Sequence, residues 1–426
     1  MRAVLLSLGV LGMATLLSEL NGGAIPYRLT TAPSIRTRVS DVPVAADRTP
    51  TRPLTRAKLG RLPVPKSKSH QVVSKVTAPS LAPKTSNIVS SAPAAATVAT
   101  SPPASPSMPP VSPEIGSTRP WVLGYYTQYS PGSIASQTSL AANLNTVTAI
   151  APLWYTYRAN GSLHTMGYHR AEIRAYAASH GIGIYPLVTN AGTNDTILTN
   201  PTIRAQVVAS LTQLAIRDNY PGFNIDFEGL NYWDRQGMSA FVIALANSLR
   251  PLGKVVTVAV IPKTVTDPYG RAYDFRILGQ YADKVVLMTY DYHDIGSPAG
   301  PVAPMGWVQA AVAYALTRMP AQKIVLGLAA YGYNWGSNGT TVEVHDVEAV
   351  HLAEREGVPI QWNSTYGEST FSYTSAGIKH TVWFENGYSD AAKIALAQAN
   401  HLGGVAIWRL GDEDPHLWTV LRQRGY

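Results

Sequence analysis

The sequence predicts a (β/α)₈ barrel with a small α+β insertion, preceded by a long spacer that lacks a folded core. Three observations lead to this fold class. All 9 Trp and all 6 Phe lie at or beyond Trp121, short β-branched or apolar runs alternate there with helical patterns, and one interval between runs is about twice as long as the others. Strands that alternate with helices form a parallel sheet, and eight such strands close it into a barrel.

The strand-like runs and the helical patterns can be placed along the chain. The expected strands begin near Val122, Thr146, Gly183, Gly222, Val255, Lys284, Lys323 and Gly404. The expected helices include Arg170–Ser179, Ile203–Arg217, Ser239–Leu249, Val308–Thr317 and Ala391–Ala399. The interval from Lys323 to Gly404 is 81 residues, so we expect an insertion at about residues 340–387, between strands seven and eight. The barrel itself is expected over residues 119–426.

Residues 25–118 have the composition of a disordered linker. This stretch holds 16 of the 31 Pro, many Ser, Thr and Ala, and Tyr27 as its one aromatic residue. It cannot bury enough apolar area to offset a chain entropy of about 1–2 kcal/mol per residue. It carries 12 Lys and Arg against 3 acidic residues, whereas residues 119–426 have a net charge of −1. A basic tether suits an anionic cell envelope, although a solvated linker explains the charge equally well.

The N-terminus, residues 1–24, has the pattern of an export signal. Met1-Arg2 is followed by a weakly polar-to-apolar run of 15 residues from Ala3 to Leu17, shorter than the ~20 residues of a membrane span. We expect a cleaved signal peptide or a retained membrane anchor, and a secreted, envelope-bound or spore-associated protein. The chain has no Cys, which excludes disulfides and thiolate metal sites. Nucleic acid is not an expected partner, because the basic stretch lacks aromatic residues for stacking.

One predicted strand places two carboxyl groups on the same face. In the run from Gly222 to Gly229, Asn224, Asp226 and Glu228 alternate with apolar residues. Alternate side chains of a strand share a face, and Glu228 comes last, at the end where barrel active sites lie. Two acids so close repel, so that one proton is held more tightly than normal, as a general acid requires. The alternative interpretation is a pair of buried acids satisfied by neighbouring strands.

These residues resemble the D-x-x-D-x-D-x-E signature of glycoside hydrolase family 18, the chitinase and endo-N-acetylglucosaminidase family. Pro221 and Asn224 stand where the signature has its first two Asp. Two further blocks are similar to the family: Met288-Thr289-Tyr290-Asp291, and the run from Gly403 to Trp408. Further blocks resemble the branch that contains spore-germination, cortex-lytic glucosaminidases. These blocks are Asn224–Glu228, Gly300–Pro304, Tyr331–Trp335, Val382–Glu385 and Trp408–Gly411.

The resemblance implies a substrate-assisted, retaining glycosidase that needs no metal and no organic cofactor. Glu228 is implied as the acid and base, Asp226 as the residue that orients the substrate's acetamido group, and Tyr290 as a hydrogen-bond donor to it. The substrate-binding residues expected around this set are Asn224, Tyr125, Asp291, Met288, Trp408 and Trp154. The expected substrate is peptidoglycan cleaved after N-acetylglucosamine, and the expected state is a monomer. A chitinase and a non-catalytic carbohydrate-binding barrel are the alternatives.

Overall fold

The computed structural model describes residues 120–192, 194–266 and 269–426. The expectations for the export signal and for the basic linker lie outside these residues. Within the described ranges, no helix combines the length and the apolar character that a membrane span requires.

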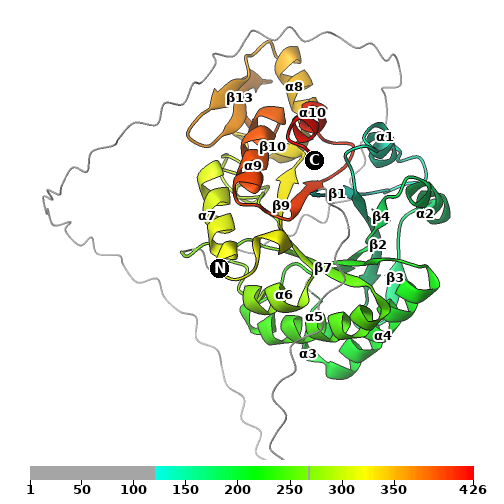
Figure 1. Ribbon diagram of the computed structural model, residues 1–426. Coiled ribbons are helices and arrows are strands. Elements are labelled where there is room, and N and C mark those ends of the chain that lie inside the picture. Colours follow the sequence, from blue (N-terminus) through cyan, green and yellow to red (C-terminus); the bar gives the residue numbers. More distant parts are fainter. Residues whose placement is uncertain (1–119, 193, 267–268) are drawn as a thin grey trace, which may run out of the picture. The chain divides into compact units, whose positions relative to one another are not determined.

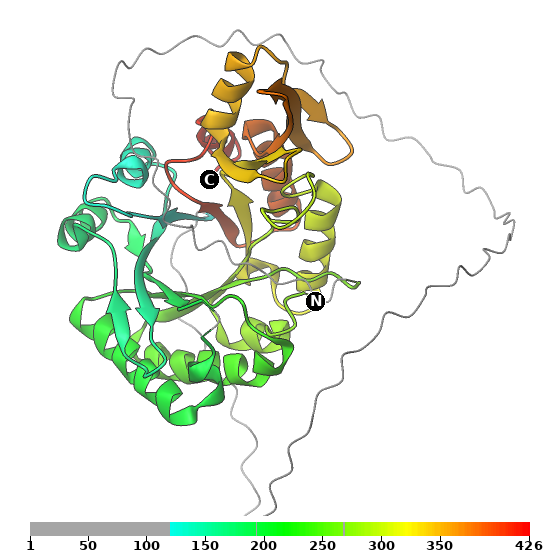
Figure 2. The ribbon, with the colours of Figure 1, turned by 180° about the vertical axis from the view of Figure 1, so that it is seen from behind.

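Eight parallel strands form a closed barrel (Figures 1 and 2), which confirms the predicted fold class. The first strand pairs with both the second and the last, and this pairing closes the sheet. The barrel strands are β1 (Trp121–Tyr126), β2 (Ala149–Tyr157), β5 (Leu187–Asn190), β6 (Gly222–Asp226), β7 (Val255–Val260), β8 (Lys284–Leu287), β9 (Ile324–Ala329) and β15 (Gly404–Trp408). Two short strands, β3 (Leu163–Thr165) and β4 (Gly183–Ile184), also pair with β2.

A glycine is required where the barrel closes. A Cβ atom on Gly404, the first residue of β15, would lie 1.9 Å from the carbonyl oxygen of Trp121. The φ angle of Gly404 is also 152°, which other residues rarely adopt. Any larger residue at this position would push β15 away from β1.

Alternation along each strand divides the core into two layers. In β1, Leu123 and Tyr125 belong to the cluster inside the barrel, whereas Val122 and Tyr126 belong to the cluster between the strands and the helices. The period of two along a strand accounts for this division. The polar side chains of a barrel strand that point inward are therefore enclosed by the other seven strands.

Helices cover the outside of the barrel (Figures 1 and 2). They are α1 (Ala135–Ala142), α2 (Arg170–Ser179), α3 (Thr196–Thr199), α4 (Pro201–Arg217), α5 (Arg235–Leu249), α6 (Phe275–Tyr281), α7 (Met305–Leu316), α9 (Gly387–Ala399) and α10 (His416–Gln423), with short 3₁₀ turns η1 (Tyr232–Asp234), η2 (Arg250–Leu252) and η3 (Ala321–Lys323). The predicted helix at Arg170–Ser179 has the same bounds in the structure. Helix α4 begins two residues before its predicted start, because the Asn200 side chain accepts hydrogen bonds from the amides of Thr202 and Ile203.

The insertion between β9 and β15 is a five-stranded antiparallel sheet with one helix against it. Its elements are β10 (Tyr331–Gly336), β11 (Thr341–His345), α8 (Asp346–Arg355), β12 (Gln361–Asn363), β13 (Glu368–Ser375) and β14 (Ile378–Phe384). This subdomain begins at Tyr331, earlier than the expected boundary near residue 340. The shift has a plain cause, because Tyr331 begins a strand that hydrogen-bonds to β11 and β14 rather than to the barrel.

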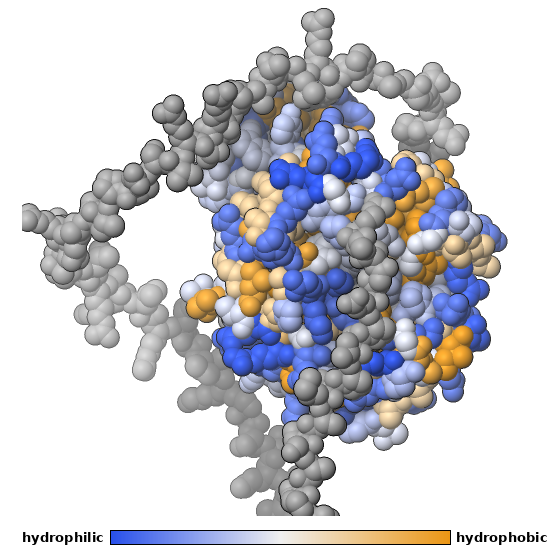
Figure 3. All heavy atoms as spheres, viewed as in Figure 1, coloured by the Kyte–Doolittle hydropathy of each residue, from blue (hydrophilic) through white to orange (hydrophobic). Residues whose placement is uncertain are grey.

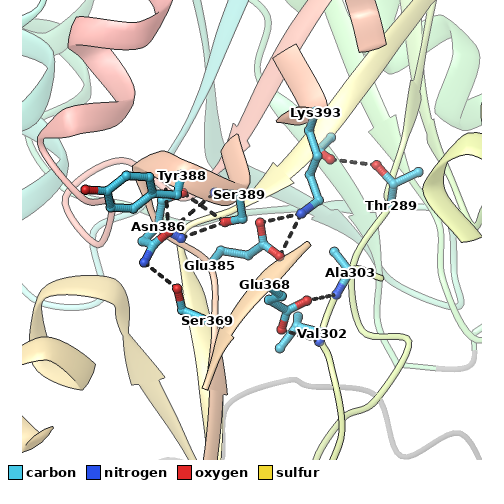
Figure 4. A network of polar contacts seen from close by, with 11 residues as sticks. Thr289, Val302, Ala303, Glu368, Ser369, Glu385, Asn386, Tyr388, Ser389 and Lys393 are labelled. Atoms are coloured by element: carbon cyan, nitrogen blue, oxygen red, sulfur yellow. Dashed lines mark hydrogen bonds and ion pairs between the residues drawn. The ribbon is translucent and has the colours of Figure 1, made fainter. Parts of the chain in front are cut away.

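Buried charged groups join the subdomain to the barrel (Figure 4). The Lys393 ammonium on α9 lies 2.9 and 2.7 Å from the two carboxylate oxygens of Glu385, which follows β14. The Glu368 carboxylate on β13 accepts hydrogen bonds of 2.7 and 2.9 Å from the amides of Val302 and Ala303, in the loop after β8. Both ends of each interaction are buried, so these contacts hold the loop and the subdomain together.

Candidate active site

Strand β6 points its polar residues into the barrel, as alternation predicts. Asn224 and Asp226 are buried, and Phe223, Ile225 and Phe227 pack in the outer cluster. Glu228 follows the end of the strand and is half-buried. The last of the three polar residues therefore lies at the carboxyl end of the barrel, where it is partly accessible.

Three polar atoms in this region are buried without a hydrogen-bond partner in the described part of the chain. They are the Tyr125 hydroxyl, Asn224 Oδ1 and Asp226 Oδ1. The Asn224 Nδ2 atom, in contrast, donates to Thr257 Oγ1 on β7 at 2.8 Å, and this bond fixes the side chain. Buried polar atoms normally have partners, so unpaired ones on three side chains suit a polar ligand.

Aromatic residues from three other strands surround the carboxyl groups. Tyr125 and Met288 lie in the inner cluster, against which Tyr290 and Trp408 pack. The rings of Tyr125 and Trp408 are 5.1 Å apart, edge to face. The structure therefore brings these four residues together inside the barrel, although they come from β1, from the end of β8 and from β15.

The electrostatics of the site favour protonated groups. Burial raises the pKa of Asp226. Burial also raises the pKa of Glu228, and the nearby charges of Asp226 and Asp291 raise it further. The pKa values of Tyr125 and Tyr290 rise through burial as well, and both hydroxyls lie within the field of the two carboxyl groups. One of the two acids can therefore hold a proton near neutral pH, and both tyrosines remain donors.

Asp291 is held by two tyrosines that the sequence did not single out as site residues. The hydroxyls of Tyr331 and Tyr333 donate to Asp291 Oδ1 at 2.7 and 2.8 Å. Burial raises the pKa of Asp291, and these two bonds lower it. Both tyrosines lie on β10, the first strand of the subdomain. Tyr331 and Tyr333 are two positions apart and directly follow a predicted barrel strand. This spacing is the feature of the sequence from which they could have been predicted.

The main chain beside Glu228 is held from two sides. Asn190, the last residue of β5, accepts from the Glu228 amide at 2.8 Å through Oδ1 and donates to the Glu228 carbonyl at 2.7 Å through Nδ2. On the other side, the buried Tyr273 hydroxyl donates to the Phe227 carbonyl at 2.6 Å. Sequence reasoning did not identify these residues either, because no motif marks them.

Trp154 is the one expected site residue that the structure does not bring to the others. It is buried in the outer cluster, where its ring lies 6.2 Å from that of Tyr220 and 5.0 Å from the Arg170 guanidinium. Alternation holds from Ala149 and Ala151, which belong to the inner cluster, as far as Trp154. The register of β2 then shifts between Leu153 and Tyr155, and Tyr155 also lies in the outer cluster. Trp154 fills the layer between the strands and the helices.

Similarity to known proteins identifies the family of this chain. Residues 122–414 match the family described as glycosyl hydrolases family 18. The chain belongs to this family. It is therefore a glycosidase, and the resemblance noted from the sequence blocks is confirmed.

Several known proteins are similar to this chain over different lengths. The glycosylase YvbX of Bacillus subtilis is 30% identical, with 70% of this chain and 91% of that protein aligned. The cortical fragment-lytic enzyme of Bacillus subtilis is 34% identical, but the match spans only 53% of this chain and 54% of that enzyme. Two crystal structures superpose well: the spore cortex-lytic enzyme SleL of Bacillus cereus and a chitinase from Chromobacterium violaceum.

The two crystal structures differ in how fully they are covered. The SleL structure gives a TM-score of 0.67 at 27% identity, over 73% of this chain and 76% of that chain. The chitinase gives a TM-score of 0.66 at 30% identity, over 71% of this chain and 98% of that chain. Solved structures named for spore cortex and for chitin thus share this barrel, and the substrate of this chain is a separate question.

Proposed function

We propose that this chain hydrolyses the β-1,4 bond on the reducing side of N-acetylglucosamine in peptidoglycan, with the substrate's own acetamido group as nucleophile. The observation that carries the proposal is the set of unpaired buried polar atoms beside Asp226 and Glu228. An acetamido group has one N–H donor and one carbonyl acceptor, which these atoms and the Tyr290 hydroxyl can satisfy. Substrate assistance of this kind is a recognised exception among glycosidases.

The proposed reaction has two steps. Protonated Glu228 gives its proton to the glycosidic oxygen while the acetamido oxygen attacks C1, so that the C1–O bond breaks and an oxazolinium ring forms. Asp226 accepts the acetamido N–H and stabilises the positive charge, and Tyr290 donates to the acetamido oxygen as it aligns. Glu228 then takes a proton from water, whose oxygen attacks C1 and opens the ring. Holding the nucleophile in line is an orientation effect.

Chitin is the second candidate substrate. Nearly the whole of the chitinase from Chromobacterium violaceum aligns with this chain, whereas only about half of the cortical fragment-lytic enzyme of Bacillus subtilis does. Peptidoglycan is preferred because several of the matching proteins carry names that refer to spore cortex or sporulation. The non-catalytic barrel is disfavoured by the presence of Glu228 at the family's acid position.

Kinetics and product stereochemistry test the proposal. We expect a higher kcat/KM for cortex fragments than for chitin oligomers of the same length, with the β-anomer appearing first by NMR.

Glu228→Gln should lower kcat about 10²–10⁴-fold while sugar binding persists. Glu354→Gln on the exposed face of α8 is the matched control. Equal or higher kcat/KM for chitin would make the protein a chitinase, and an α-anomer formed first would exclude the mechanism.

The proposed setting is outside the cytoplasm, at the cell envelope or the spore. The pattern of residues 1–24 supports export, and the net charge of +9 on residues 25–118 supports attraction to an anionic envelope. The chain is proposed to act as a monomer on the polysaccharide.

A further inference from the structure

A pocket of ≈ 400 Å³ lies at the start of α5, beside the loop that follows β7, and it is rich in basic side chains. Arg235, Lys263 and Arg271 line it together with the hydroxyl groups of two threonines. None of these residues belongs to the catalytic set described above. Residues 119–426 as a whole carry a net charge of −1. Three basic side chains around one pocket therefore make this region more positive than the rest of the barrel.

Lys263 is the buried part of this pocket. Lys263 is only 6% exposed, and its ammonium donates a hydrogen bond to the Tyr273 carbonyl. An ammonium has three donors, and this bond uses one of them. Asp274 is the acid near Lys263, and its carboxylate lies 2.7 Å from the Arg235 guanidinium. Burial and the charge of Arg235 lower the pKa of Lys263 to about 8, and a bound anion would offset both effects.

One residue, Tyr273, connects the pocket to the segment that carries Glu228. Tyr273, whose carbonyl binds Lys263, also donates its hydroxyl to the Phe227 carbonyl at 2.6 Å, next to Glu228. Tyr232, which lines the pocket, follows β6 and is 66% exposed, and its ring lies 4.9 Å from that of the exposed Trp233. Exposed rings of this kind can stack on a sugar, so a glycan that reached from Glu228 to Tyr232 would meet a stacking surface at the edge of the pocket.

We propose that this pocket binds a carboxylate carried by the glycan, so that the preferred substrate class is a polymer whose sugars bear acidic substituents, as muramic acid does. The inference rests on the proposed function and deepens it, because chitin has no anionic group for these cations to bind. Arg235 already donates to Asp274 Oδ2 through Nε and Nη2. A glycan carboxylate therefore offers acceptors to Lys263 and Arg271, and charge-assisted hydrogen bonds of this kind are the strong ones.

Binding to a catalytically silenced full-length protein tests the pocket without turnover. The protein is Glu228→Gln, and the probes are a peptide-free tetrasaccharide of alternating N-acetylglucosamine and N-acetylmuramic acid, and the same sugar with its carboxyl groups amidated. Calorimetry at low salt should show about tenfold tighter binding of the acidic form, as expected for hydrogen bonds to a buried charge. A third probe that carries the stem peptides shows whether the lactyl or the peptide carboxyl is bound.

Two arginine variants give the matched comparison. Arg271→Gln should reduce the preference for the acidic probe by about two- to fivefold, the size of an exposed charge pair. Arg276→Gln removes the same charge from an exposed position on α6 outside the pocket, and it should leave the preference unchanged. Lys263→Met, checked for an unchanged Tm, should abolish the preference.

The outcomes separate this inference from the proposed function. Equal binding of the acidic and the amidated probes, or equal effects of Arg271→Gln and Arg276→Gln, would overturn the carboxylate site even if peptidoglycan is cleaved. Failure of the wild-type chain to hydrolyse any N-acetylglucosamine polymer would overturn the proposed function, while the calorimetric preference would still report on the pocket.

Discussion

The carboxyl group of Asp226, at the end of β6, affects the proton affinity of Glu228. The charge of Asp226 contributes to the raised pKa of Glu228, after burial. In the proposed mechanism Glu228 must carry its proton, so the rate should fall as the pH rises through the pKa of Glu228. Asp226→Asn removes the neighbouring charge and lowers that pKa. We therefore expect the alkaline limb of the kcat profile to move to lower pH. This shift should accompany the lower kcat of Asp226→Asn.

This prediction is checked by pH–rate profiles of the wild type, Asp226→Asn and the control Glu354→Gln. The control lies on the exposed face of α8 and should keep the wild-type limb. An alkaline limb that stays in place in Asp226→Asn would mean that another group titrates there.

Asn190 has a positioning role, since it bonds to the main chain of Glu228 through both atoms of its amide. Asn190→Ala removes both bonds and frees the residue that carries the acid. A displacement of about 1 Å in an active site can cost on the order of 10²-fold in rate. We expect kcat to fall on the order of tenfold to a hundredfold, with KM changed much less.

Asn143→Ala is the matched control for this variant. Asn143 is also buried, and its amide donates to the Ser139 carbonyl at 2.9 Å, near the end of α1 and outside the site. It should lose similar stability and retain kcat. If both variants reduce kcat equally, the effect of Asn190 is only structural.

At the scale of elements, the loop after β8 depends on β13. Glu368 accepts from the amides of Val302 and Ala303, and all three residues are buried. Glu368→Ala leaves two buried donors without partners, each at a cost of about 1–3 kcal/mol. We expect a free energy of unfolding lower by roughly 2–5 kcal/mol, measured by urea denaturation.

The same variant should affect catalysis, because the loop after β8 also carries Tyr290 and Asp291. We expect a lower kcat at temperatures where Glu368→Ala remains folded. Glu354→Ala removes an exposed carboxylate from the same subdomain and should stay within about 0.5 kcal/mol of the wild type. Unchanged stability of Glu368→Ala would show that the loop holds its position without β13.

At the scale of the whole molecule, positive charge is concentrated before the barrel. Residues 25–118 carry a net charge of +9 and residues 119–426 a net charge of −1. Removal of residues 1–118 should leave activity on soluble fragments unchanged, since the closed barrel and the catalytic set lie beyond them. Binding to intact cell walls should weaken, and the lost part should be the part that salt screens.

Co-sedimentation with cell walls at low and high salt measures this effect. A chain of full length in which the linker Lys and Arg are replaced by Gln separates charge from length. That chain should bind walls like the truncated one. Equal sedimentation of all three proteins at low salt would show that the linker acts as a spacer alone.

The sequence by itself determined the fold class and the family. Alternation along Asn224, Asp226 and Glu228 placed the acids on one face, and eight spaced strand patterns required a closed barrel that encloses that face. Periodicity is local information, so it survives in a single sequence. Periodicity breaks in β2 at the register shift between Leu153 and Tyr155, where Trp154 and Tyr155 both belong to the outer cluster.

Only the tertiary structure decided which residues support the acids and what lies beside them. The bonds from Asn190 to Glu228, from Tyr273 to Phe227, and from Tyr331 and Tyr333 to Asp291 join residues 38 to 46 positions apart. The pocket around Lys263 likewise combines a loop with the ends of separate helices. Such contacts follow from strand neighbours and from loop paths, which have no period in the sequence, so they emerge only when the barrel closes.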